Sequence, residues 1–138
     1  VLRSSPTVIV DAGHNPHGVA ALMPAVEEAF GFSHLVAVMG AMADKDVEGI
    51  LSILEPACDA VVCVPIDSPR AMDVEDLGAV AREVFGADRV QVAQTLADGV
   101  DRAVALSEGG DAPLTASGVL IVGSVVLAAE ARALFRRP

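Results

Sequence analysis

Five short apolar segments alternate with five segments of helical periodicity along the 138-residue sequence. The segment 7–10 is apolar on both faces, which is typical of a central strand covered by helices on both sides, whereas the segment 89–93 alternates polar and apolar residues like an edge strand. Helix-length connections between successive strands require parallel pairing with right-handed crossovers. The sequence therefore predicts an α/β fold, a Rossmann-like three-layer sandwich with a mostly parallel sheet of five or six strands and helices on both faces. The predicted strands are 7–10, 34–39, 60–64, 89–93 and 118–124.

Capping residues mark the predicted helix boundaries. Asn15 is a good N-cap, Pro16 suits the first helical position, and Gly31 ends the first helical pattern. Asp73 is the expected N-cap of the third helix. Pro24 falls inside the first pattern, so we expect it to kink or divide that helix.

Composition limits the class of protein and its partners. With 53% hydrophobic residues the chain can bury a real core, and we assign residues 7–138 to one domain preceded by a linker remnant at 1–6. Nine basic residues against nineteen acidic ones give a net charge of −10, which disfavours a nucleic-acid partner or an anionic membrane surface. No apolar run approaches the roughly 18 residues of a membrane span, and no secretory signal pattern is present, so the expected location is cytoplasmic.

The two cysteines, Cys58 and Cys63, lack the repeated spacing of a disulfide framework or a metal site. We expect both to be core or strand-edge residues. The sequence predicts no metal site elsewhere in this chain.

Polar residues follow the predicted strands at the ends where ligands bind in open α/β sheets. Parallel pairing brings the segments 11–14, 40–46, 65–70 and 123–124 to one edge of the sheet. The segment 11–18 concentrates an acid, an imidazole and an amide in a turn that leads into a helix N-terminus. This edge is the expected active site.

Three common motifs are absent from the sequence. Gly13 and Gly18 have P-loop spacing, but Val19-Ala20 stands where a P-loop needs Lys followed by Ser or Thr. No G-x-G-x-x-G follows the first strand, so a dinucleotide fingerprint is missing. A hydrolytic triad of Ser124, His14 and Asp11 can be drawn, but the nucleophile elbow G-x-S-x-G is lacking.

Four segments resemble the folylpolyglutamate synthase and dihydrofolate synthase family of the Mur ligase superfamily, in the family's order. Residues 11–18 resemble its D-G-A-H-N-P signature, 40–46 its G-x-x-x-D-K-D segment, 69–71 its P-R-A loop and 123–132 its G-S-L-Y-x-x-G-E-x-R ending. The chain departs from these motifs where Ala12-Gly13 inverts the usual Gly-Ala order, where Val126 replaces an aromatic residue and where Ala129 replaces a glycine.

The resemblance implies a C-terminal ligase domain that closes over an N-terminal ATPase domain of the same chain. In this family ATP and Mg²⁺ are used, with the magnesium held mainly by that N-terminal domain. The folate or dihydropteroate carboxylate is activated as an acyl phosphate, and the amine of L-glutamate attacks it. The isolated domain is expected to be inactive. Alternatives are another Mur-type amide ligase domain or a non-catalytic α/β module that binds a nucleotide or metabolite.

Residue by residue, the resemblance implies roles at the active cleft. His14 and Ser124 match positions associated with the incoming glutamate, and Lys45 and Asp46 match cleft positions without an assigned step. Asp11 matches a nucleotide-contacting aspartate. The predicted catalytic residues are His14, Lys45 and Ser124, and the predicted nucleotide-binding residues are Asp11, His14 and Asn15.

Each of these residues also has a purely structural interpretation. Asp11 and Asn15 can satisfy N–H groups of the turn and the helix start, and His14 can be a solvated turn residue. Lys45 can pair with Asp44 or Asp46, and Ser124 can simply cap the last helix. Arg70 can remain a solvated loop charge or steer a carboxylate.

Overall fold

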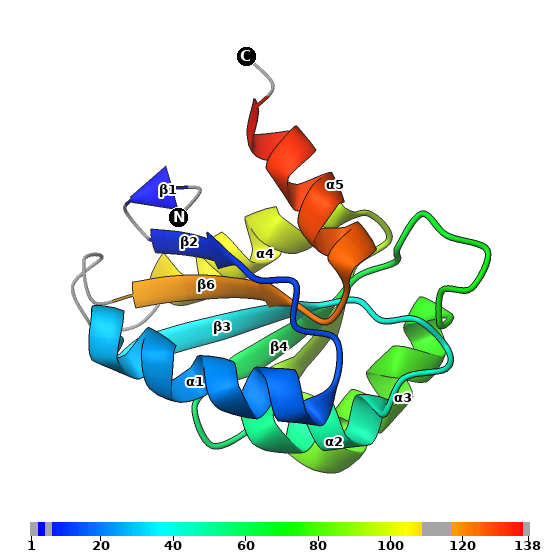
Figure 1. Cartoon of the computed structure of the whole chain (residues 1–138), viewed down its shortest axis with the longest axis horizontal. Helices are drawn as coiled ribbons and strands as arrows, with labels where there is room; N and C mark the ends of the chain where they lie inside the picture. Colours follow the sequence, from blue (N-terminus) through cyan, green and yellow to red (C-terminus); the bar gives the residue numbers. More distant parts are fainter. Residues whose placement is uncertain (1–2, 5–6, 109–116, 137–138) are drawn as a thin grey trace.

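The strands form one six-stranded sheet at the centre of the computed structural model, which describes residues 3–4, 7–108 and 117–136. The order across the sheet is β1-β2-β6-β3-β4-β5, and every pairing is parallel except that of β1 with β2 (Figure 1). This architecture confirms the predicted Rossmann-like sandwich. The strands are β1 (Arg3–Ser4), β2 (Thr7–Val10), β3 (His34–Met39), β4 (Ala60–Cys63), β5 (Val90–Val92) and β6 (Ser117–Val122).

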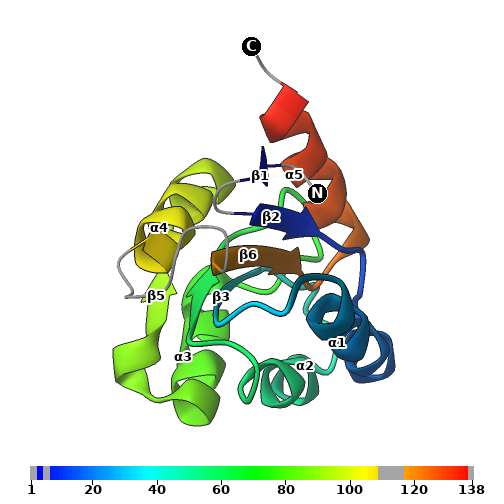
Figure 2. The ribbon, with the colours of Figure 1, turned by 90° about the vertical axis from the view of Figure 1, so that its left-hand side faces the viewer.

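Helices cover both faces of the sheet, as Figure 2 shows. The helices α1 (Pro16–Phe30), α2 (Val47–Leu54) and α3 (Val74–Phe85) pack on one face, and α4 (Leu96–Glu108) and α5 (Val125–Arg136) pack on the other. Alternate residues of each inner strand enter the two separate cores, because successive side chains of a strand point to opposite faces. Strands without a polar face are therefore explained by burial on both sides.

The predicted helix ends are confirmed at several positions. The Asn15 side-chain oxygen accepts a hydrogen bond from the Gly18 amide at 2.7 Å, and Asp73 accepts hydrogen bonds from the first turn of α3. Gly31 ends α1 in the left-handed region, with φ 56°. The helix α1 is not divided at Pro24, however. Pro24 and Ala20 are both exposed, so the Ala20 carbonyl that Pro24 leaves without an N–H partner is not forced into the apolar core.

A sixth strand lies where the sequence suggested a linker remnant. Arg3 and Ser4 pair antiparallel with Val8 and Thr7, which extends the sheet beyond β2. The alternation of strands and helices did not predict this strand, because a segment of two residues is too short to show a hydrophobic periodicity. At the opposite edge lies β5, as its alternating pattern predicted.

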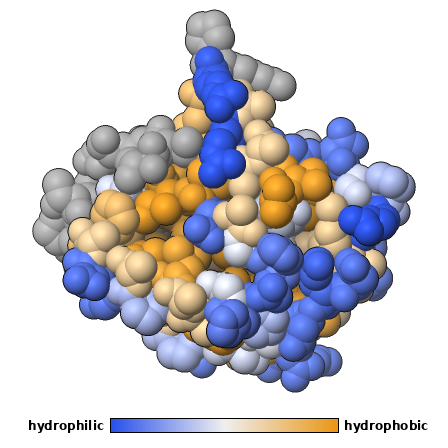
Figure 3. Space-filling model, viewed as in Figure 1, coloured by the Kyte–Doolittle hydropathy of each residue, from blue (hydrophilic) through white to orange (hydrophobic). Residues whose placement is uncertain are grey.

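The molecular surface and the core divide polar from apolar residues in the expected way. Hydrophilic residues dominate the side where α3 lies, while hydrophobic residues gather between α1 and α5 (Figure 3).

Cys58 and Cys63 are free and buried, as expected, and burial raises the pKa of each thiol to about 12. Among the helices of the described ranges, none is long and apolar enough to cross a membrane.

Candidate functional site

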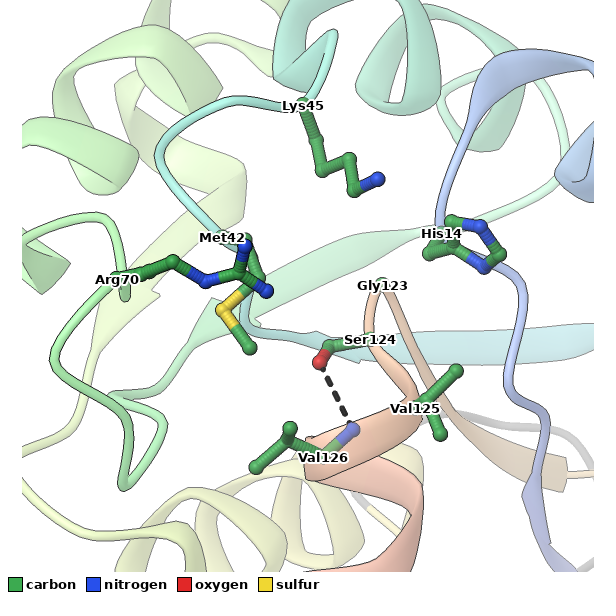
Figure 4. A pocket seen from close by; sticks show the side chains of 8 residues that line it. All are labelled: His14, Met42, Lys45, Arg70, Gly123, Ser124, Val125 and Val126. Atoms are coloured by element: carbon green, nitrogen blue, oxygen red, sulfur yellow. Dashed lines mark hydrogen bonds between the residues drawn. The ribbon is translucent and has the colours of Figure 1, made fainter.

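A cavity of about 210 Å³ opens at the carboxyl ends of the central strands (Figure 4). Each of the four segments that the sequence placed at one edge of the sheet contributes to its lining. The lining residues are His14, Met42, Lys45, Arg70, Gly123, Ser124, Val125 and Val126. The predicted catalytic residues His14, Lys45 and Ser124 therefore lie around one cavity, together with Arg70.

The floor of this cavity is the sharp turn between β6 and α5. Gly123 adopts φ 121°, which only glycine readily takes, and a Cβ at this position would collide with the carbonyl oxygen of Gly40. Ser124 is 2% exposed, and its Oγ accepts hydrogen bonds from the amides of Val126 at 3.0 Å and Leu127 at 3.4 Å. Ser124 thus caps α5 and also lines the cavity. Since its oxygen accepts backbone N–H groups, its own hydroxyl proton is available to a ligand.

Two cationic side chains reach the cavity from different loops. Lys45, which is the only lysine in the sequence, and Arg70 extend toward the same space as His14 (Figure 4). Neither forms an ion pair with a carboxylate of the described residues. Asp46, one of the two alternative partners for Lys45, instead caps α2 by accepting a hydrogen bond from the Gly49 amide at 3.0 Å. Lys45 and Arg70 are therefore available to an anionic ligand.

His14 is oriented by its own turn. Its Nδ1 lies 3.2 Å from the carbonyl oxygen of Ala12. Because a carbonyl oxygen only accepts hydrogen bonds, this contact requires the proton on Nδ1. Nε2 of the neutral ring is then a hydrogen-bond acceptor that a ligand can use.

Asp11 and Asn15 are not among the residues that line the cavity. The Asp11 carboxylate accepts a hydrogen bond from the Gly13 amide at 2.8 Å through Oδ2, and Asn15 caps α1. The structural interpretation thus describes the contacts of both side chains within the chain, and their nucleotide-binding role stays a prediction. Asp11 is half-buried, and within the described part of the chain its Oδ1 accepts no hydrogen bond, so one carboxylate oxygen remains for a ligand hydroxyl.

The charge and size of the cavity favour a small anion. Its lining includes Lys45, Arg70 and the N-terminus of α5 but no carboxylate, although the whole chain carries a net charge of −10. A helix N-terminus adds partial positive charge and free N–H groups. The volume of about 210 Å³ lies below the roughly 300–1,000 Å³ of pockets that enclose drug-sized ligands. A ligand of the size of an amino acid fits within this volume.

The side chains that line the cavity do not suit a magnesium ion. The described residues contain no cluster of three or more His, Cys, Asp or Glu side chains able to hold a metal. Mg²⁺ prefers carboxylate oxygens and water, whereas the cavity presents cations and apolar groups.

Part of the cavity wall is apolar and was not predicted from the sequence. Met42 is 8% exposed and Val125 is 58% exposed, and both line the cavity beside the polar residues. Met42 lies inside the predicted rim segment 40–46 and Val125 directly follows the segment 123–124, but apolar residues in a motif carry no signal that separates a cavity wall from the core. Only the path of the loops in the folded chain shows that these two residues line the cavity.

Comparisons with known proteins identify the family to which the chain belongs. The family model for the Mur ligase glutamate ligase domain matches residues 1–124. The chain is 46% identical over 144 residues to a dihydrofolate synthase/folylpolyglutamate synthase from Mycobacterium tuberculosis, and the alignment covers 99% of this chain and 29% of that protein. The resemblance noted in the sequence is therefore confirmed.

Solved structures of relatives share the fold. Folylpolyglutamate synthase from Mycobacterium tuberculosis, complexed with ADP, matches with a TM-score of 0.93 at 46% identity, over 99% of this chain and 31% of that one. Escherichia coli FolC in complex with DHPP and ADP matches with a TM-score of 0.78 at 29% identity, over 97% of this chain and 30% of that one. The sequence thus spans under a third of the length of these relatives. On the match of the family model and the shared fold, this chain belongs to the Mur ligase glutamate ligase domain family.

Proposed function

We propose that this chain is the glutamate ligase domain of an ATP-dependent folylpolyglutamate or dihydrofolate synthase. The complete enzyme would join the amine of L-glutamate to a folate or dihydropteroate carboxylate through an acyl phosphate. The observation that carries the proposal is the cavity at the carboxyl ends of the strands, where Lys45 and Arg70 face a small space lined by no carboxylate. Glutamate brings two carboxylates, and an acidic chain needs local positive charge to hold them.

The side chains around the cavity suit different groups of glutamate. Lys45 and Arg70 would bind its carboxylates, and the Ser124 hydroxyl would donate a further hydrogen bond. With the proton on Nδ1, Nε2 of the neutral His14 ring would accept a hydrogen bond from the amino group of the substrate. These groups would hold the amine at the carbonyl carbon that it attacks, so the chain's main contribution is orientation.

The proposal also includes a bound nucleotide and a second, N-terminal domain. Relatives of this chain are complexed with ADP. We assign nucleotide contacts to Asp11, whose Oδ1 is available, with His14 and Asn15 in the same turn. ATP would supply the phosphoryl group, with Mg²⁺ held by an N-terminal ATPase domain of the same protein. Closure of the two domains would exclude water, which otherwise hydrolyses an acyl phosphate.

The test uses the full-length protein that contains this chain. ADP release is measured with dihydropteroate and with a reduced folate, each with and without L-glutamate. We expect release to depend on glutamate with at least one acceptor, and a glutamylated product to form in equal amount. Release that requires a different amino acid or acceptor would indicate another Mur-type ligase. Nucleotide binding without release under any acceptor would indicate a non-catalytic module.

A further inference from the structure

One carboxylate on α5 holds the loop that carries Arg70. Glu130 Oε1 accepts a hydrogen bond from the backbone amide of Asp67 at 3.1 Å, between residues 63 positions apart in the sequence. Asp67 lies in the loop between β4 and α3, and Arg70 follows it in the same loop. Because Ser124 caps the start of α5, this one helix both lines the cavity and fixes the neighbouring loop.

The opposite side of the same loop is fixed by the segment that carries Lys45. The Ala43 amide donates to the carbonyl oxygen of Arg70 at 2.8 Å, and the Met72 amide donates to the carbonyl oxygen of Ala41 at 2.9 Å. Within the loop, the Arg70 amide donates to Ser68 Oγ at 3.2 Å. The Arg70 backbone is therefore positioned from two sides, and the hydrogen bond between the Asp67 amide and Glu130 joins the loop to α5.

Packing alone does not account for a carboxylate at this position. The neighbouring surface is apolar, with Leu96, Ala97, Ala133 and Leu134 around Glu130. Glu130 Oε2 is buried and accepts no hydrogen bond from the described residues. Burying a carboxylate oxygen without a partner is unfavourable, so an apolar side chain would suit the site better if packing were its sole role.

We propose that Glu130 is a positioning residue that holds the Asp67 amide and so directs Arg70 into the cavity next to Ser124. The inference rests on the proposed use of this cavity for glutamate, because Arg70 acts there by binding a carboxylate. Glu130 itself does not touch the substrate. Its effect on catalysis would therefore pass entirely through the loop.

The first test compares variants of the full-length protein. Glu130→Ala removes the acceptor, and we expect the KM for glutamate to rise roughly tenfold while kcat changes little, since misplacement of a binding group weakens ground-state binding. Glu130→Gln keeps an acceptor oxygen and has no charge to bury, so it should restore a KM close to that of the wild type. The Arg70→Ala/Glu130→Ala double variant should be no worse than Arg70→Ala alone.

Two control variants separate this contact from general effects. Asp67→Ala should leave the KM unchanged, because the donor is the main-chain N–H and not the side chain. Arg136→Ala alters an exposed residue of α5 outside the motif at 123–132, and should also leave the KM unchanged. A Glu130→Gln variant as impaired as Glu130→Ala, or additive losses in the double variant, would overturn the proposal.

A second measurement does not depend on activity. Hydrogen exchange of the segment 66–71 should be faster in Glu130→Ala than in the wild type and in Glu130→Gln, because the Asp67 amide loses its acceptor. Unchanged exchange in Glu130→Ala would overturn the positioning role even in an active enzyme. Faster exchange in a protein that does not use glutamate would support the contact and refute the proposed function instead.

Discussion

The backbone amide of Gly123 donates a hydrogen bond to the carbonyl oxygen of Gly13 at 2.9 Å. This bond joins the turn after β2 to the turn after β6, which are distant in sequence but follow neighbouring strands. It brings the cap of α5 beside the turn that orients His14. The geometry of the cavity therefore depends on the backbone at Gly123 as much as on the polar side chains.

A Cβ at position 123 should destabilise the protein more than one at another glycine of positive φ. Gly123→Ala forces φ 121° on alanine and drives its Cβ into the Gly40 carbonyl, so we expect a loss of roughly 2–4 kcal/mol in the free energy of unfolding. Gly86→Ala is the matched control, since φ is 87° there but no atom lies within 4 Å of the Cβ. That variant should lose only about 1–2 kcal/mol. Urea denaturation compares the two, and equal losses would contradict the close approach at Gly40.

Removing the charge of Lys45 should weaken glutamate binding. Lys45→Met keeps much of the apolar stem but not the ammonium group, and we expect the KM for glutamate to rise roughly 10- to 100-fold, as for the loss of a charged hydrogen bond. Raised salt should increase the wild-type KM more than that of the variant, because salt screens the attraction. Arg102→Met is the control, since Arg102 pairs with Asp98 away from the cavity. A KM that is unchanged in Lys45→Met would remove Lys45 from the site.

Single substitutions of Asp11, His14 and Ser124 should separate the use of ATP from the use of glutamate. Asp11→Ala should mainly raise the KM for ATP, whereas His14→Ala and Ser124→Ala should mainly raise the KM for glutamate. Ser124→Ala also removes an N-cap and should lower stability by about 1 kcal/mol. Asp73→Ala removes a cap of α3 distant from the cavity, so it should match that stability loss without the kinetic change. An Asp11→Ala enzyme with unaltered ATP dependence would refute the nucleotide assignment.

Stability should fall in alkaline solution because of the two buried thiols. Burial raises the pKa of Cys58 and Cys63 from 9.0 to about 12, so the unfolded chain releases these protons first as the pH rises above 9. The stabilisation is complete below pH 9 and is lost as the pH approaches 12, at up to about 1.4 kcal/mol per pH unit for each thiol. The sequence has no tyrosine and one lysine, so few other groups titrate in this range.

Urea denaturation from pH 8 to pH 10.5 measures this effect. A Cys63→Ala variant should show a shallower decline with pH, although its stability at pH 8 should also be lower because of the cavity that the substitution leaves. An unfolding free energy that stays level across this range would contradict the burial of the thiols.

The sequence by itself determined five of the six strands, the five α-helices, several of their ends and the segments that form the rim. Periodicity and capping chemistry are local, so Asn15, Gly31 and Asp73 could be assigned from their neighbours alone. Parallel pairing places the carboxyl ends of the five parallel strands at one edge, which is why His14, Lys45 and Ser124 could be expected together before their contacts were known.

Only the tertiary structure decided the order of the strands, the pairing of β1 and which residues of the rim line the cavity. It separated Asp11 and Asn15 from the cavity and added Met42 and Val125 to its wall. It also showed that Glu130 holds the Asp67 amide. Contacts of this kind depend on the register of strands and the path of loops between distant parts of the chain, and local sequence patterns carry no information about either.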